Sequence, residues 1–338
     1  LDSVEAGGTD NVAIGDHAGT AITTGDYNTI VGSDALDANQ TGIQNTAVGY
    51  QSLTTSTASN NTAVGAYSMR DNTTGGNNVA VGISALKENT EGDNNTSIGN
   101  SSLCNNTTGT DNTAVGHESL KANTTGNNNI AIGKNALDAN TSANYNTAVG
   151  GVSLTTNTTG CENTALGYAA LNLNLTGDKS VAVGYAALNK NTADNNTAVG
   201  HSSLACNTTG ERNTGIGVCA LSGNTTHVNN TAVGYHALKI NGANDNTAIG
   251  CGAMQCATTG NVNAAVGSLS LCGNTTGSCN TAMGVPALSS NTTGSGNTAF
   301  GSLALNANTT ASNNTAVGKD ALLCNISGAE NTAVGMNA

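Results

Sequence analysis

The sequence is poor in the large side chains that fill an ordinary globular core. Its 338 residues include no tryptophan, one phenylalanine and one proline, and only 9% of them are charged. The apolar share is mostly alanine, valine and leucine, whose sizes suit a thin, regularly layered interior. The thick core that a globular domain of this length normally buries is therefore excluded.

Basic residues are scarce as well. Nine lysines and arginines stand against 21 aspartates and glutamates, which gives a net charge of −12. That balance excludes the basic surface that binds nucleic acid and the polybasic patch that binds anionic membranes. No stretch approaches the roughly 20 apolar residues of a transmembrane helix, and the chain opens at Leu1 without a methionine or a signal-type segment. We expect a soluble product, either processed or a fragment, with no nucleic-acid partner and no membrane insertion.

Sequence motifs of catalysis are also missing. The chain contains no G-x-S-x-G, H-E-x-x-H, Walker or dinucleotide-binding motif, and its five histidines are scattered. No G-G-x-G-x-D calcium repeat occurs. A carbohydrate-cleaving groove would need clustered carboxylates and aromatic platforms, whereas aromatic residues make up 2% of the chain. We therefore predict that the protein is not an enzyme and has no catalytic residue, no cofactor and no metal site.

The chain does contain a 17-residue repeat, N-T-A-V-G-x-x-[AS]-L-x-x-N-T-T-G-x-x, from Asn11 to the C-terminus. We number its positions 1 to 17, call each copy a coil, and count the coils from the one that begins at Asn11 (coil 1) to the one that begins at Asn331 (coil 20). Position 5 is glycine in all twenty copies, and position 4 is always apolar. Position 9 is Leu or Met in every full copy except the first, which has Gly19. Position 8 is only Ala or Ser, and position 3 is small apart from Ile30. We interpret positions 4 and 9 as the core and positions 3 and 8 as columns that must stay small.

Three copies lack one residue, and the deletions indicate where the coil tolerates change. The copies that begin at Asn45, Ser180 and Asn230 each lose a residue in the half that contains N-T-T-G. A one-residue slip inside a strand would turn its core side chains outward, whereas a loop absorbs it. The N-T-T-G segment is therefore predicted to be a solvent-exposed corner.

Together these columns predict an all-β fold, a parallel β-solenoid (β-roll) of about 20 coils. T-A-V and x-[AS]-L would form short strands, and the segments around positions 5 and 12 to 15 would bend. Position 1, which is Asn in nineteen copies, would form a ladder of stacked amides. At the parallel-strand spacing, such a stack measures about 95 Å. We divide the single domain 1–338 into a half-coil (1–10), nineteen repeats (11–330) and a half-coil (331–338).

The strictly small position 8 has two interpretations. A 17-residue coil buries little apolar surface, so a single solenoid is expected to need neighbours, and small residues would permit close approach between chains. Alternatively, Ala and Ser fill the narrow interior of one coil. The sequence does not decide between them.

The repeat N-T-A-V-G-x-x-[AS]-L-x-x-N-T-T-G resembles the head repeats of trimeric autotransporter adhesins, and it is similar to repeats in phage tail fibres and in surface proteins of aquatic microbes. This resemblance covers almost the whole chain. It implies a left-handed parallel β-roll, commonly with three chains side by side, and a role in adhesion or as a fibre shaft. A surface glycan or receptor would then be the partner.

Nine cysteines favour an oxidising, extracellular setting. Cys256 and Cys272 lie in neighbouring columns one coil apart, which is compatible with a disulfide. Cys206 with Cys219 and Cys272 with Cys279 are weaker pairs, and no C-x-x-C zinc pattern occurs.

The N-x-[ST] sequon recurs at the position-12 corner, where it is either good turn chemistry or a row of N-glycosylation sites. The thirteen copies carry it at Asn39, Asn72, Asn106, Asn123, Asn140, Asn157, Asn174, Asn207, Asn224, Asn274, Asn291, Asn308 and Asn325.

We predict a structural subunit of an extracellular, cell-surface or virion-surface fibre, whose partner is itself. Copies would associate side by side, or head to tail through the two terminal half-coils. The alternative is an adhesin head or phage tail-fibre segment. An ice-binding solenoid is a remote alternative: Thr recurs at positions 2, 13 and 14, but position 2 is expected to share a strand face with core position 4.

Overall fold

The computed structural model describes residues 8–338, and these residues form twenty three-residue strands and no helix. Every strand occupies positions 2 to 4 of one coil. The predicted half-coil 1–10 lies mostly outside the described residues. The strands up to residue 169 are β1 (Val12–Ile14), β2 (Thr29–Val31), β3 (Thr46–Val48), β4 (Thr62–Val64), β5 (Val79–Val81), β6 (Thr96–Ile98), β7 (Thr113–Val115), β8 (Ile130–Ile132), β9 (Thr147–Val149) and β10 (Thr164–Leu166). The strands after it are β11 (Val181–Val183), β12 (Thr197–Val199), β13 (Thr214–Ile216), β14 (Thr231–Val233), β15 (Thr247–Ile249), β16 (Ala264–Val266), β17 (Thr281–Met283), β18 (Thr298–Phe300), β19 (Thr315–Val317) and β20 (Thr332–Val334).

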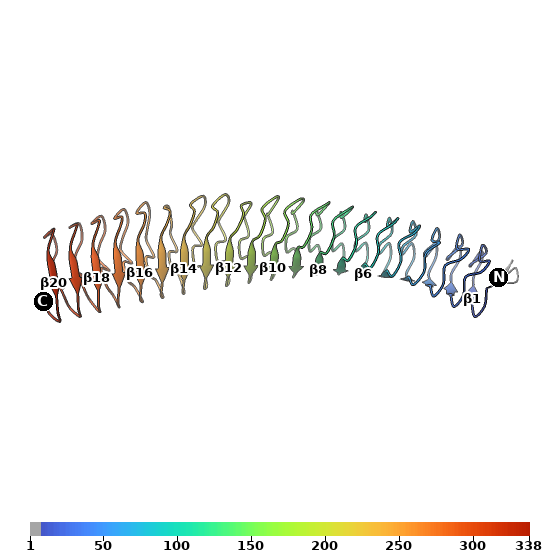
Figure 1. The fold of residues 1–338 in the computed structure, drawn as a ribbon, viewed down its shortest axis with the longest axis horizontal. Coiled ribbons are helices and arrows are strands. Elements are labelled where there is room, and N and C mark those ends of the chain that lie inside the picture. Colours follow the sequence, from blue (N-terminus) through green and yellow to red (C-terminus); the bar gives the residue numbers. More distant parts are fainter. Residues whose placement is uncertain (1–7) are drawn as a thin grey trace. The chain divides into compact units, whose positions relative to one another are not determined.

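The chain divides into two compact units, 1–169 and 170–338. In each unit ten strands stack in chain order as a parallel sheet (Figure 1). Partner residues are one repeat apart, so that Thr29 pairs with Thr46 and Thr298 with Thr315. The predicted parallel β-solenoid with one coil per 17 residues is therefore confirmed.

The three short coils keep this register. Thr46 pairs with Thr62, Val181 with Thr197 and Thr231 with Thr247, each across 16 residues. The strands are aligned as elsewhere, so the missing residue is taken out of the N-T-T-G corner, as the sequence predicted.

The interior is built from a different set of columns than the sequence suggested. Position 3 points inward, and its side chain is fully buried in β3 to β18. Position 9 and position 8 are buried opposite it, as Leu120 and Ser119 illustrate. Position 4 is not buried in any coil. The prediction that position 4 is core is wrong, because alternation along the strand puts positions 2 and 4 together on the outer face once the small position 3 faces the interior.

Position 8 lies inside a single coil, which decides between the two interpretations left open by the sequence. Ala187 and Ser203 are fully buried without a partner chain. Where the residue is serine, its hydroxyl donates to a nearby carbonyl, as from Ser68 to Gly65 at 2.9 Å. The column is small because the interior is narrow.

The x-[AS]-L segment is not the second strand that we expected. Positions 7 and 9 adopt left-handed backbone conformations, for example Glu118 (φ 54°) and Leu120 (φ 51°), whereas a strand requires extended φ throughout. The segment still bonds between coils, since the amide of Leu120 donates to the carbonyl of Ala136 at 2.9 Å. The left-handed turns fold the leucine side chain into the interior, where its burial offsets about 1 kcal/mol or more of backbone cost.

Glycine at position 5 ends every strand for two reasons. Gly116 has φ +132°, which L-residues rarely adopt. A Cβ there would also lie 2.7 Å from the carbonyl carbon and oxygen of Gly133 in the next coil. Conformation and close approach together account for the invariance of this column.

Candidate functional site: an exposed strand face and three polar ladders

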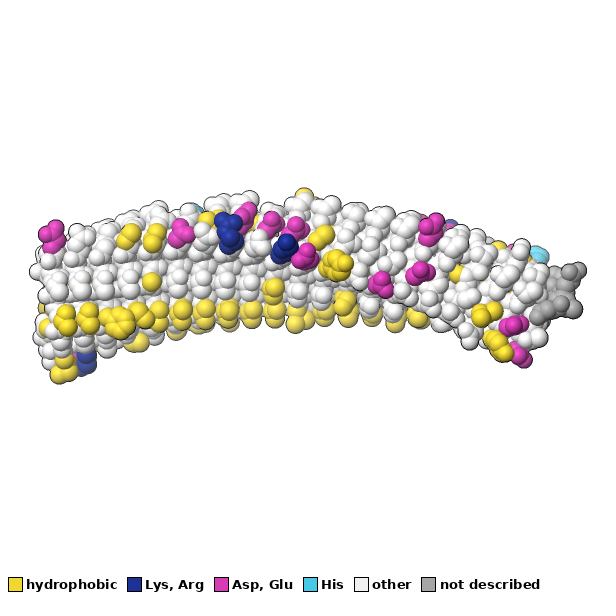
Figure 2. All heavy atoms as spheres, viewed as in Figure 1, with side chains coloured by type: hydrophobic (Ala, Val, Ile, Leu, Met, Phe, Trp, Pro, Cys, Tyr) yellow, Lys and Arg dark blue, Asp and Glu magenta, His cyan; other side chains and the backbone are white. Residues whose placement is uncertain are grey.

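The outer side of the strands carries two parallel rows of side chains, at positions 2 and 4, which we call the strand face. Position 4 is Val, Ile, Leu, Met or Phe in all twenty coils, and position 2 is Thr in fifteen coils and Val, Ile or Ala in the rest. Ile249 is 40% exposed and Phe300 50% exposed. Figure 2 shows the apolar row most clearly over the unit 170–338. Neither row contains a charged residue.

The threonines of the strand face differ from those at the corner. At position 13 the hydroxyl donates to the carbonyl of the next coil, as from Thr107 to Thr124 at 3.0 Å and from Thr275 to Thr292 at 3.0 Å. Within residues 8–338, no position-2 threonine hydroxyl bonds to another protein group. The corner threonines therefore stabilise the stack, whereas those of the strand face present their hydroxyls and methyl groups outward.

The position-1 asparagines form the predicted ladder. The Oδ1 of each accepts the backbone N–H of the next position-1 residue, as Asn78 does from Asn95 at 2.8 Å. Its Nδ2 donates to the position-15 carbonyl of its own coil, as from Asn78 to Gly92 at 2.8 Å. These side chains are buried, and the bonds satisfy backbone groups that a bend would otherwise leave unpaired.

A second ladder runs through position 12, and the sequence did not reveal it. The Nδ2 of Asn123 donates to Oδ1 of Asn106 in the preceding coil at 2.8 Å and to the carbonyl of Gly126 at 3.0 Å. The same pair of bonds recurs at Asn106 and Asn291. The pattern had been interpreted as an exposed turn because N-T-T-G is also good turn chemistry.

The sequon asparagines are consequently not exposed, and that part of the prediction is wrong. Twelve of the thirteen have no exposed surface, namely Asn39, Asn72, Asn106, Asn123, Asn140, Asn157, Asn174, Asn207, Asn224, Asn274, Asn291 and Asn308, and Asn325 is half-buried. In the ladder, both protons of Nδ2 are donated inside the protein. A glycan on that nitrogen would remove a donor from the ladder and has no room in the buried column.

A third ladder uses position 16, where several coils carry an acidic residue. The position-16 amide of one coil donates to the position-16 side chain of the next, as from Gly76 to Asp93 at 2.7 Å and from Ser278 to Ser295 at 3.1 Å. The frequent Asp, Asn and Ser in this column were the signal that could have identified it.

Within residues 8–338 none of the nine cysteines forms a disulfide. Cys256 is exposed and Cys272 is half-buried. The disulfide predicted between them is not formed in the structure. Burial, with a smaller contribution from the nearby Cys256, raises the pKa of the Cys272 thiol. Pairing under oxidising conditions stays a prediction, to be checked by peptide mapping without reductant.

One charged cluster stands out on the outer surface of coils 6 to 8. The Lys121 ammonium lies 2.6 Å from the Glu118 carboxylate and lowers its pKa. The pKa of Asp138, one coil away, is raised by burial and then by the charge of Glu118. Burial likewise raises the pKa of the Cys104 thiol. A raised pKa keeps the sulfur protonated, and the protonated thiol is unreactive. The cluster is therefore a surface salt bridge between Lys121 and Glu118, with the partly buried Asp138 beside it.

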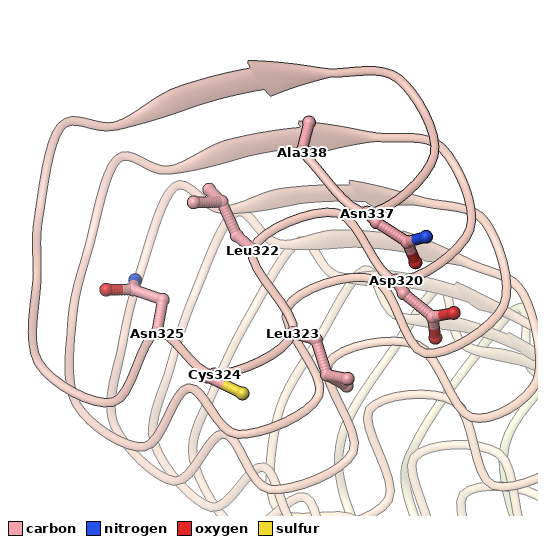
Figure 3. Close-up of a pocket in the computed structure, with 7 residues that line it drawn as sticks. All are labelled: Asp320, Leu322, Leu323, Cys324, Asn325, Asn337 and Ala338. Atoms are coloured by element: carbon pink, nitrogen blue, oxygen red, sulfur yellow. The ribbon is translucent and has the colours of Figure 1, made fainter.

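Across residues 8–338 no three His, Cys, Asp or Glu side chains are placed to hold a metal ion. The described chain also has no helix that could cross a membrane. A hollow at residues 320–338 is lined by Leu322, Asn325 and Ala338 (Figure 3). Leu322 and Asn325 belong to the position-9 and position-12 columns, which are buried in the preceding coils. The hollow is thus the uncovered face of a coil.

No protein-family model matches the chain, and no curated protein matches it. The strand face and the ladders therefore have to be interpreted from their own chemistry.

Proposed function

We propose that the protein is a structural subunit of an extracellular fibre, in which solenoids pack side by side through the strand face. The occupant of that face is a second copy of the same chain. The observation that carries the proposal is the uncharged, apolar position-4 row, which is half-buried or exposed in every coil and buried in none. Contiguous apolar surface of this extent is characteristic of interaction sites and unusual for a free monomer.

The area of the strand face fits a stable interface. Three residues span about 10 Å along a strand, and ten strands at ~4.8 Å give each unit a face of roughly 480 Å². A standard interface buries about 800 Å² per partner, so the face of each unit alone supplies more than half of that area. Because both copies present the same repeat, side chains of one can fill the spaces between rows of the other along the whole face.

End-to-end stacking is the second part of the proposal. Coils bond to their neighbours through backbone amides and carbonyls, as the amide of Leu120 does to the carbonyl of Ala136 in the next coil. Stacked coils of another copy would present matching amides and carbonyls. The alternative function, as an adhesin head or a tail-fibre segment, differs from the fibre subunit only in adding a surface glycan or receptor as partner. This alternative rests on the resemblance of the repeats.

Charge substitutions on the strand face test the proposal. Val115→Lys and Val233→Lys place a cation on the position-4 row, one in each unit. The matched controls Thr125→Lys and Thr226→Lys put the same charge on an exposed corner of the same repeat or the one before it. Sedimentation velocity and electron microscopy should show the parent and both controls as bundles, and both face variants as single-width solenoids. Face variants that assemble like the parent would overturn the proposal.

Ice binding is a second candidate for the same face, favoured by one observation. The reason for setting it aside was that positions 2 and 4 would both face the core, and the structure shows both facing outward. Fifteen outward threonines beside an apolar row form a regular array that can order water. A parent protein that stays a single chain and shows thermal hysteresis would favour this candidate over assembly, whereas bundles without hysteresis would exclude it.

A further inference from the structure

The corner of coils 13 to 15 departs from the repeat both at position 12 and at position 13. Ala257 stands in the position-12 column, so nothing donates to Oδ1 of Asn241, which is 4% exposed and has no hydrogen-bond partner. Coil 14 is also one residue short, and it has Gly242 where position 13 is normally threonine. The corner therefore lacks both a ladder bond and a threonine hydroxyl bond.

The missing residue alone does not account for this. The short coil 11 retains its corner bonds, because the Thr192 amide donates to Thr208 at 2.9 Å and Asn207 donates to Oδ1 of Asn191 at 2.6 Å. By contrast, among the described residues the Gly242 amide has no hydrogen-bond acceptor, and that glycine is only half-buried. Its proton is therefore not held by a hydrogen bond within the described protein.

Asn241 and Gly242 also form the only Asn-Gly sequence in the chain. At the other position-12 asparagines the next residue is usually a β-branched threonine. Its amide is commonly bonded to the next coil, as from Thr124 to Thr141 at 2.9 Å. A glycine has no side chain to obstruct attack by its own nitrogen, and a free amide can lose its proton.

We propose that Asn241 is a site of spontaneous deamidation in the folded protein. A base in the solvent removes the Gly242 amide proton, and the nitrogen attacks Cγ of Asn241. The Cγ–Nδ2 bond breaks, Nδ2 leaves as ammonia, and a five-membered succinimide remains. Water then adds to one of the two imide carbonyls and opens the ring to aspartate or isoaspartate, so that the net change is asparagine plus water giving an acid plus ammonia.

The product would weaken the same corner further. The Nδ2 of Asn241 donates to Oδ1 of Asn224 at 2.8 Å and to the Ala243 carbonyl at 2.9 Å. A carboxylate would replace this donor with a buried negative charge that faces two acceptors. The modification would therefore change the position-12 ladder from within and open the corner to solvent.

The test follows deamidation by peptide mapping during incubation in mildly alkaline buffer. In the parent, the peptide containing Asn241 should convert to a mixture of aspartate and isoaspartate while peptides containing Asn191 or Asn207 stay unchanged. Ala257→Asn should slow the conversion, because it supplies the missing donor to Oδ1. Asn241→Ser, which copies the natural Ser56 at position 12, should abolish it.

Incubation in denaturant separates the effect of the fold on the deamidation rate from the effect of the Asn-Gly sequence itself. There the Asn-Gly step should proceed in the parent and in Ala257→Asn at equal rates. Melting of Ala257→Asn checks that the variant is folded. An unmodified Asn241 in the native parent, or equal native rates for the parent and Ala257→Asn, would overturn the proposal.

Discussion

Ile30 occupies the space that Gly19 leaves empty in the first coil. A Cβ placed on Gly19 would lie 2.7 Å from Cδ1 of Ile30 and 3.0 Å from Cδ1 of Ile22. Both isoleucines are fully buried, at positions that are otherwise small or asparagine. The three exceptions to the repeat therefore form one compensating set: the leucine missing from position 9 is replaced by volume from positions 3 and 12.

This compensation predicts a non-additive mutant series. Gly19→Leu alone should destabilise the N-terminal coils by roughly 1–3 kcal/mol, because the new side chain overpacks against Ile30. Combining it with Ile30→Ala and Ile22→Asn restores the consensus and should recover most of the loss. Chemical denaturation of the parent, Gly19→Leu and the triple variant measures these differences. A triple variant no more stable than Gly19→Leu would show that the residues are independent.

Completing the position-12 ladder should stabilise the fold. Ala257→Asn is expected to raise the free energy of unfolding by about 1 kcal/mol, since it pairs the buried Oδ1 of Asn241. Ala257→Val is the control, because it adds bulk at the same position without an amide. Equal melting temperatures for the two variants would argue against a role for the hydrogen bond.

The ladder also predicts that folded material is unmodified at the position-12 asparagines. In a host that glycosylates secreted proteins, peptides containing Asn123 from the soluble, folded fraction should carry no glycan, because its Nδ2 is buried and donates twice. Peptide mass measurement checks this. A folded solenoid glycosylated at Asn123 would contradict the packing described for the corner.

The raised pKa of Asp138 predicts that the folding stability of the protein depends on pH. Its folded-state pKa lies above its unfolded one, mainly because of burial. The ionised form is therefore the disfavoured one, and stability falls as pH rises through the folded pKa. Asp138→Asn should be more stable than the parent at neutral pH and lose this advantage in acid. Asn306, which holds the same repeat position, shows that the residue is compatible with the fold. An advantage that does not change with pH would point to another cause.

The fold followed from the sequence because its main determinants appear as columns. The period, the glycine at position 5, the asparagine at position 1 and the corner deletions each leave a visible pattern. The assignment of position 4 to the core was wrong. Val and Ile at position 4 resemble core residues when the residue that faces the other side of the strand, at position 3, is as small as Ala114. Which face of such a strand turns inward depends on the width of the coil, and no single column records that width.

The polar ladders were only partly visible for a related reason. Asn123 in N-T-T-G is equally consistent with a turn, a glycosylation site and a buried amide, so the residue pattern alone does not separate them. At position 16 the acceptors are mixed, with Asp93, Ser295 and Asn127 serving the same bond. A column conserved in hydrogen-bonding capacity but not in residue type is hard to recognise without the backbone.

Hydroxyl-radical footprinting at increasing protein concentration tests the central claim, that the strand face is where copies associate. Phe300 and Met283 report on the position-4 row, and Tyr145, 64% exposed at the end of its repeat, reports on a surface outside it. Our account predicts that modification of Phe300 and Met283 falls as the protein assembles while that of Tyr145 stays constant. Assembly that leaves Phe300 and Met283 as reactive as in the dilute protein would contradict it.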